Sequence, residues 1–198
     1  WRLADLIDEN ADELAQLETL DQGKPLSVAR GADVPGSAET FRYMAGWATK
    51  IEGSTIPIGV PDTLVAYTRR EPIGVVGQIV PWNFPLAMAA WKLAPALAAG
   101  CTVVLKPAEE TVLDAFLMAE AAVAAGLPPG VLNVVPGGRE LGAYLVAHPG
   151  VDKVSFTGST AAGRAIARTC AELLRPVTLE LGGKSAAILL DDVDLSAS

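Results

Sequence analysis

The 198-residue sequence has little cysteine and histidine: two cysteines, Cys101 and Cys170, and one histidine, His148. The cysteines lie far apart and lack metal-ligand spacing, which indicates a reducing, cytoplasmic setting rather than a disulfide framework. A multi-histidine metal site or a Ser-His-Asp triad would have to be built around His148, which precedes a Pro-Gly pair in a predicted loop. We therefore expect no metal, and we interpret His148 as an ordinary surface residue.

Long basic clusters and uninterrupted apolar runs are also missing. The longest basic cluster is Arg69-Arg70 and the formal net charge is −8, so we expect no nucleic-acid partner. The longest apolar stretch, residues 86–105, is interrupted by Lys92, Pro95 and Gly100, which favours a buried helix followed by a strand over a membrane span. No signal peptide opens the chain, and we expect no membrane partner.

What the sequence does contain is a globular composition, with 51% hydrophobic and 19% charged residues. Its length suits one domain, or one domain with an appendage. The first residue is Trp1 rather than methionine, and an amphipathic helical pattern starts at once. We therefore expect a piece of a longer protein.

The first third of the chain divides into two regions. Residues 1–54 carry helical periodicity on both sides of a "DQGKPL" turn, and predict a helical part that belongs to the following domain. Residues 55–72 are rich in glycine, proline and β-branched residues, and "TLVAYTRR" alternates like a strand. An isolated strand edge seeks a partner, so we expect residues 55–72 to form an extended oligomerisation arm.

From residue 73 to residue 198 the pattern changes to apolar strands that alternate with helices, as expected for a dinucleotide-binding α/β domain. Such near-continuous apolar strands are typical of an open, mainly parallel sheet with helices on both faces, a Rossmann-like variant. The predicted strands are 74–82, 101–106, 130–135, 152–158, 176–181 and 185–190, and the predicted helices are 86–99, 111–126, 140–149 and 160–174.

Polar residues follow several of these strands. Right-handed crossovers would bring the strand ends to one carboxyl edge, where open α/β sheets bind ligands. Each residue alone is typical of a turn or a cap, whereas their occurrence on successive strands favours a ligand crevice. The residues are Asn83, Lys106, Glu109, Gly158, Ser159 and Glu180.

Two glycine-containing turns could bind an anion. In "FTGSTAAG" a strand leads directly into a helix whose first amides are free, which suits either an anion site or a plain Ser/Thr N-cap. "PGGREL" has glycines at 137, 138 and 142 but does not spell the dinucleotide fingerprint, so it is weak evidence on its own.

Longer segments resemble a known family. "PWNFPLAMAAWKLAPALAAGCTVVLKPAEET", "VDKVSFTGSTAAGR" and "VTLELGGKSAAILL" are similar to the aldehyde dehydrogenase superfamily, and within it to the NAD-linked enzymes that oxidise aldehydes to carboxylic acids. "LETLDQGKPL" and "AYTRREPIGVV" resemble its upstream segments, so the resemblance covers essentially the whole chain. It implies NAD as cofactor, a small-molecule aldehyde as substrate, and a homodimer or homotetramer, which agrees with an oligomerisation arm over 55–72.

The resemblance also implies catalytic roles. Asn83 would donate its side-chain amide to the oxyanion formed when a thiolate attacks the aldehyde, a contribution of about 2.7–4 kcal/mol to the barrier. Glu180 would be the general base that activates water to hydrolyse the thioester, and Lys92 would belong to a proton relay. Desolvation of a carboxylate at an apolar strand end would make Glu180 a stronger base near neutrality.

Cofactor contacts follow from the same resemblance. Lys106 and Glu109 would hold the adenosine ribose hydroxyls, which favours NAD over NADP. The Gly-Gly pair after Leu181 would let the backbone approach a bulky cofactor closely. The remaining contacts would be Ile79, Val80 and Trp82 along the cofactor, Gly158 and Ser159 at the pyrophosphate, and Leu181 and Gly182 beside the nicotinamide.

The sequence departs from the family pattern at three places. Val112 stands where the family usually has proline, and Arg139 replaces a frequent glycine. The family's nucleophilic cysteine would fall beyond Ser198, with the catalytic domain, so both are absent from this chain. Cys101 and Cys170 lie in apolar segments without an activating cation in sequence, and we interpret both as small core residues.

Three functions are compatible with these patterns. The first is an NAD-dependent aldehyde dehydrogenase, represented here by its cofactor-binding half. The second is a non-catalytic truncated product that binds dinucleotide or pairs with other subunits. The third is a reductase of acyl phosphates or acyl-CoA, against which Glu180 weighs because those reactions need no hydrolytic water.

Overall fold

A computed structural model describes residues 1–59 and 64–193 and centres on a parallel five-stranded sheet. The strands are β3 (Val75–Ile79), β4 (Thr102–Lys106), β5 (Leu132–Val134), β6 (Lys153–Gly158) and β7 (Val177–Leu181). Their order is β5-β4-β3-β6-β7, and every pair is parallel. The chain thus starts in the middle, proceeds to one edge and returns to the other side of β3. This order confirms the Rossmann-like prediction and places a topological switch point between β3 and β6.

The N-terminal residues form helices, as predicted, although the opening pattern is split in two. The elements are α1 (Arg2–Glu9), α2 (Ala11–Gln22), α3 (Leu26–Val28), the π-helix η1 (Ala29–Asp33) and α4 (Val34–Ala45). The split occurs at Asn10, whose side-chain amide donates to the Leu6 carbonyl at 2.7 Å. Helix α2 ends at Gly23, which has a φ of 81° and reverses the chain without a side-chain clash.

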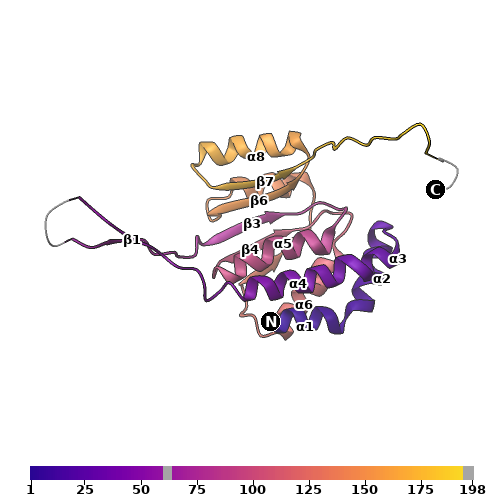
Figure 1. Cartoon of the computed structure of the whole chain (residues 1–198), viewed down its shortest axis with the longest axis horizontal. Helices are drawn as coiled ribbons and strands as arrows, with labels where there is room; N and C mark the ends of the chain where they lie inside the picture. The colour runs from indigo at the N-terminus through magenta and orange to yellow at the C-terminus, as the bar shows by residue number, and fades with distance from the viewer. Residues whose placement is uncertain (60–63, 194–198) are drawn as a thin grey trace.

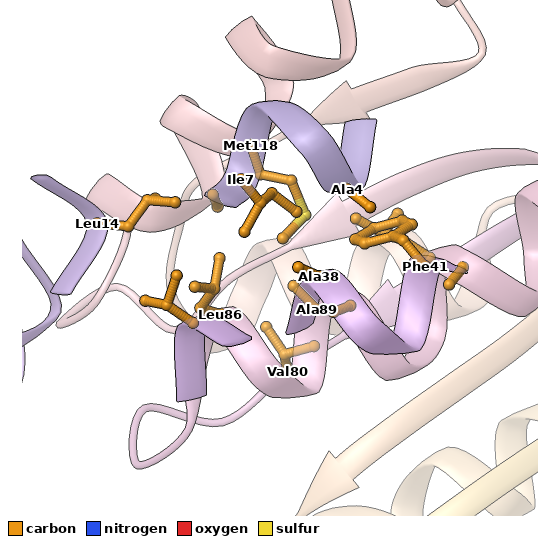
Figure 2. Packing of buried hydrophobic residues seen from close by; sticks show 14 of the residues in the cluster. Ala4, Ile7, Leu14, Ala38, Phe41, Val80, Leu86, Ala89 and Met118 are labelled. Carbon is orange, nitrogen blue, oxygen red and sulfur yellow. The ribbon is translucent and has the colours of Figure 1, made fainter. Parts of the chain in front are cut away.

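One face of the sheet is covered by these helices together with α5 (Pro85–Ala98) and α6 (Leu113–Ala124). Ile7, Phe41, Leu86 and Met118 meet in the core between them (Figure 2). Strand β4 contributes its alternate residues, which are fully buried. Within the predicted helical region 1–54, the helices end at Ala45, and α1, α2, η1 and α4 share one hydrophobic core with the sheet.

Helices α7 (Arg139–Ala147) and α8 (Thr160–Glu172) cover the other face. Leu145 from α7 and Ile166 from α8 pack with Val154 and Phe156 of β6. Val104 joins this second core, whereas its neighbours on β4 join the first, as the two-residue period of a strand requires. The prediction of helices on both faces is confirmed.

The described residues of the predicted arm, 55–59 and 64–72, extend away from the body (Figure 1). Strands β1 (Thr55–Ile56) and β2 (Ala66–Tyr67) pair antiparallel within it, separately from the main sheet. The predicted strand over 63–70 is therefore much shorter than expected, and Thr63 lies outside the described residues. Apolar side chains of the arm are exposed, including Val65 at 79% and Tyr67 at 70%.

The predicted strand over 185–190 is wrong. Residues 182–190 have no regular secondary structure and extend away from the body (Figure 1). Ile188, Leu189 and Leu190 are 82%, 69% and 65% exposed. An apolar run becomes a strand only where another strand completes its hydrogen bonds, and the described part of the chain offers this segment no such partner.

Candidate active site

An open groove of about 1290 Å³ runs between helix α5 and strands β6 and β7. Helix α5 covers the middle of the sheet, whereas no helix within residues 1–59 and 64–193 covers the same face of β6 and β7. Trp91 and Lys92 from α5 form one wall. The floor consists of alternate residues of the two strands: Lys153, Ser155, Thr157, Thr178 and Glu180.

The carboxyl end of this groove brings together seven residues predicted from the sequence: Trp82, Asn83, Gly158, Ser159, Glu180, Leu181 and Gly182. The parallel register explains their proximity. Ile79 at the end of β3 is level with Phe156 of β6, and Thr157 is level with Glu180. The loops that follow β3, β6 and β7 therefore leave the sheet at the same edge, on both sides of the switch point.

Lys92 lies within the groove wall rather than at its surface. Its ammonium nitrogen donates to the Ser155 hydroxyl at 3.0 Å, and its main-chain carbonyl accepts from the Gln78 amide at 2.8 Å. Burial lowers the pKa of Lys92 to about 8, while the charge of Glu180 opposes that shift. The structure thus couples Lys92 electrostatically to Glu180, although the sequence separates the two by almost half of the chain.

Glu180 lies in β7, but its side chain is exposed in the open groove. The expected desolvation at an apolar strand end is therefore wrong for the described residues. The apolar neighbours Val177 and Leu179 point to the opposite face, where they pack beside α8. Strand alternation puts Glu180 on the uncovered face, so solvent reaches its carboxylate.

Asn83 belongs to a short loop between β3 and α5. Pro85 is the first residue of α5, and a proline at that position needs no amide partner. The Asn83 side chain is exposed at the groove, and its main-chain carbonyl accepts a hydrogen bond from the Gln22 amide at 3.3 Å. A residue of the α2 terminus therefore contacts the loop that presents Asn83.

Lys106 and Glu109 do not line the groove but lie beside the start of α7. Lys106 is 6% exposed, and its ammonium donates to the Pro107 carbonyl at 2.8 Å. Burial lowers the pKa of Lys106, while Glu109 and Glu110 oppose the shift. A Cβ at Gly138 would lie 2.8 Å from the Glu109 carboxylate, which shows that this carboxylate packs against the start of α7.

Ile79 and Val80 are buried, with exposed fractions of 9% and 3%. Ile79 packs in the α7–α8 core, and Val80 packs in the opposite core beside α5. Their side chains are therefore committed to packing, which leaves only main-chain atoms for a ligand.

Ser159 caps helix α8. Its hydroxyl oxygen accepts a hydrogen bond from the Ala162 amide at 3.2 Å, which confirms the N-cap interpretation. The same residue lines the groove, so the cap and a ligand contact are compatible in position.

The sequence reasoning missed polar residues on the groove floor. Lys153, Ser155 and Thr157 alternate with Val154 and Phe156, and this alternation could have shown that one face of the strand is open. Lys184, which follows the Gly-Gly pair, also lines the groove. Lys184 lies outside any strand, so no alternation in the sequence could identify it as a groove residue.

Both cysteines are free and buried, as expected for small core residues. Cys170 is fully buried, and burial raises the pKa of its thiol while Arg175 opposes the shift. Cys101 precedes β4, so it lines the groove toward the amino edge of the sheet, whereas Asn83 and Glu180 lie at the carboxyl end. Neither thiol has the cationic environment of an activated nucleophile at the carboxyl edge.

His148 is half-buried, and its ring nitrogen accepts a hydrogen bond from the Gly150 amide at 3.0 Å. Across residues 1–59 and 64–193, no group of three or more His, Cys, Asp or Glu side chains is arranged to hold a metal ion. Among the same residues, no helix combines the length and apolar character needed to cross a membrane.

Comparisons with known proteins agree with this architecture. The model of the aldehyde dehydrogenase family matches residues 1–198. A phenylacetaldehyde dehydrogenase of Pseudomonas fluorescens is 57% identical over 198 residues, covering 98% of this chain and 39% of that protein. A geranial dehydrogenase of Castellaniella defragrans is 55% identical over 199 residues, covering 99% of this chain and 41% of that protein.

The fold is shared as well. A solved structure of an aldehyde dehydrogenase from Bacillus cereus, in complex with NAD⁺, has a TM-score of 0.91 and 56% identity, covering 98% of this chain and 40% of that one. The chain thus spans about two fifths of the length of these relatives. Because the match extends over its whole length at this identity, the chain belongs to the aldehyde dehydrogenase family.

Proposed function

We propose that this chain supplies the dinucleotide-binding part, and two of the catalytic side chains, of an enzyme that oxidises an aldehyde to a carboxylic acid with NAD. The observation that carries the proposal is the groove at the switch point, which is lined both by Asn83, from the loop after β3, and by Glu180, from strand β7. The region over 1–54 and 73–198 would be one cofactor-binding domain.

The residues present suit NAD chemically. Lys106 and Glu109 offer a donor and an acceptor for ribose hydroxyls, and both side chains lie beside the start of α7. The α8 terminus at Ser159 and the exposed Trp82 ring, 57% accessible, border the same edge. The NAD⁺ complex of the Bacillus cereus relative supports this assignment.

Bound NAD would accept a hydride from the substrate, and the residues of this chain would manage the charges and protons around that transfer. The Asn83 amide would donate to the oxyanion. Glu180 would take a proton from the water that hydrolyses the thioester, and the buried ammonium of Lys92 would hold its charge near that carboxylate. The nucleophilic cysteine would lie outside these 198 residues, because neither Cys101 nor Cys170 reaches the carboxyl edge.

The test is formation of NADH by the full-length enzyme with phenylacetaldehyde and geranial. Asn83→Ala should lower the rate of the first turnover roughly a hundredfold, because one fixed oxyanion donor contributes about 2.7–4 kcal/mol. Chain 1–198 alone should produce no NADH. Robust NADH formation by this chain, abolished by Cys101→Ala, would contradict the proposal.

We also propose that the arm over 55–72 joins subunits into a homodimer or homotetramer. Its short β1–β2 pair leaves outer strand edges and exposed apolar side chains, which suit a second copy. Deletion of the arm from the full-length enzyme should lower the mass measured by light scattering. An unchanged mass would show that the arm serves its own subunit instead. A cytoplasmic location is supported by two free, buried cysteines.

A further inference from the structure

The end of helix α2 lies directly against the loop that carries Asn83. We define the α2 turn as residues Gln22–Lys24, where Gly23 adopts its left-handed conformation and reverses the chain. Two side chains of this turn contact the loop, one at Asn83 and one at Phe84. Neither Gln22 nor Lys24 lines the groove, so these side chains can influence the groove only through the loop that they contact.

Gln22 makes the first contact. Its amide nitrogen donates to the main-chain carbonyl of Asn83 at 3.3 Å and to the Glu18 carboxylate at 3.2 Å. Glu18 is fully buried, so it anchors the Gln22 amide at a fixed point of helix α2. The hydrogen bond to Asn83 spans 61 residues of sequence, which makes it a tertiary restraint rather than a local turn contact.

Lys24 makes the second contact. Its ammonium lies 4.1 Å from the centre of the Phe84 ring, a cation–π distance. The ammonium is itself held by Glu18 at 2.8 Å and by Asp33. Its side chain is 8% exposed, so the ion pairs and the ring contact form in a poorly solvated environment. The α2 turn therefore contacts the loop at two consecutive residues, Asn83 and Phe84.

From this geometry we propose that Gln22 is a positioning residue for the oxyanion donor: its hydrogen bond fixes the Asn83 main chain, so that the Asn83 side chain points to one place in the groove. The inference rests on the proposed role of Asn83. A displaced donor loses strength steeply, and small misplacements of catalytic groups cost large factors in rate. Gln22 would act on the reaction without touching substrate or cofactor.

The experiment is a double-mutant cycle in the full-length enzyme. Gln22→Met keeps the length of the side chain and removes the donor. With NAD and the best substrate among acetaldehyde, phenylacetaldehyde and geranial, it should slow the first-turnover formation of NADH roughly tenfold. In an Asn83→Ala background the same substitution should change that rate by less than about twofold, because the donor to be positioned is gone.

Two further variants separate positioning from a loss of folding. Gln16→Met makes the same change on the exposed face of α2 and should leave the rate unaltered. Gln22→Lys retains a donor that can reach both Glu18 and the Asn83 carbonyl, and should restore most of the rate. The dissociation constant for NAD should stay within about twofold in all of them.

The outcomes are distinguishable. If Asn83→Ala leaves the first turnover unchanged, the proposed role of Asn83 fails, and this inference fails with it. If Asn83→Ala is slow but Gln22→Met matches the wild type, only the inference is overturned. Equal losses from Gln22→Met in both backgrounds, or no rescue by Gln22→Lys, would also overturn it, because they would show a general structural effect.

Discussion

Two groups of charged residues approach the Asn83 loop, and they differ in their access to solvent. The acid cluster, defined as Glu18, Asp33 and Asp114 around Lys24, is closed: its three carboxylates are 0%, 5% and 1% exposed. The groove is open, and its carboxylate, Glu180, is exposed. Burial raises the pKa of Glu18 to about 7 and that of Asp114 to about 8.

The difference shows that a perturbed pKa does not by itself locate chemistry in this protein. Desolvation dominates both shifts in the acid cluster, and a group shielded from solvent is equally shielded from substrate. The residue with the strongest claim to act as a base, Glu180, is recognised instead by its position on the uncovered face of β7. In the groove, the buried ammonium of Lys92 is the group whose pKa is lowered.

The largest expected effect is in the open groove. Glu180→Gln in the full-length enzyme should slow steady-state turnover by a hundredfold or more, because a general base contributes about 10²–10⁴ in rate. The initial burst of NADH should survive, since hydride transfer precedes hydrolysis. Rapid mixing followed by steady-state assay separates the two phases. Glu172→Gln on the exposed end of α8 is the matched control. Loss of the burst as well would remove Glu180 from the hydrolytic step.

Within the acid cluster, Asp114 should affect stability rather than turnover. Asp114 binds its proton more tightly in the folded state, so its stabilising contribution is complete at low pH and is lost as pH rises from about 4 to about 8. The loss can reach about 1.4 kcal/mol per pH unit. The Asp114→Asn side chain does not titrate, so this variant should not lose that stability. The free energy of unfolding of the variant, relative to that of the wild type, should therefore rise between pH 5 and pH 8.

Unfolding temperatures of the full-length enzyme across this pH range provide the measurement. Glu120→Gln, on the exposed face of the same helix, should keep the wild-type pH dependence. The charged groups that face Asp114 are Glu18, Asp21, Lys24 and Asp33. The three carboxylates raise the pKa of Asp114 further, whereas the Lys24 ammonium lowers it. An Asp114→Asn profile parallel to the wild-type profile would show that the buried carboxyl does not titrate in this window.

The smallest expected effect concerns cofactor choice at Glu109, which is exposed beside the α7 turn. A 2′-phosphate near this carboxylate would be repelled by roughly 1 kcal/mol in water at about 4 Å, and by more where solvent is excluded. Wild type should therefore bind NAD more tightly than NADP, and Glu109→Gln should improve NADP binding about fivefold or more. Titration calorimetry with both dinucleotides tests this, with Glu110→Gln as the control. Equal wild-type affinities would contradict it.

Much of the fold could be predicted from the sequence because its strands are short apolar runs with clear helical segments between them. The segments over 101–106, 152–158 and 176–181 became β4, β6 and β7 with small shifts at their ends. The segment over 185–190 is also rich in apolar residues but has no strand partner among residues 1–59 and 64–193, and composition carries no information about partners. The short β2 is a difference of the same kind, whereas the split of the first helical pattern occurs at Asn10, beside its local hydrogen bond to Leu6.

The candidate site was predictable as a set of strand-end residues but not as a geometry. Asn83, Ser159 and Glu180 could be named because each follows or ends an apolar strand. That Lys106 and Glu109 lie beside α7, apart from the groove, depends on the face of β4 that Lys106 occupies and on the path of the turn that follows the strand. The contact between Gln22 and Asn83 has no sequence signal, because the two residues are 61 positions apart.

The sequence by itself determined the alternation of strands and helices, the polar residues at strand ends and the family to which they belong, because these depend on local pattern. The tertiary structure alone decided which charged side chains are shielded from solvent. Glu180 ends an apolar strand yet is exposed, since α5 stops short of β7, while Asp114 sits in an ordinary helical pattern yet is buried beside Glu18. Desolvation depends on every element packed around a group, and those elements meet only after the chain has folded.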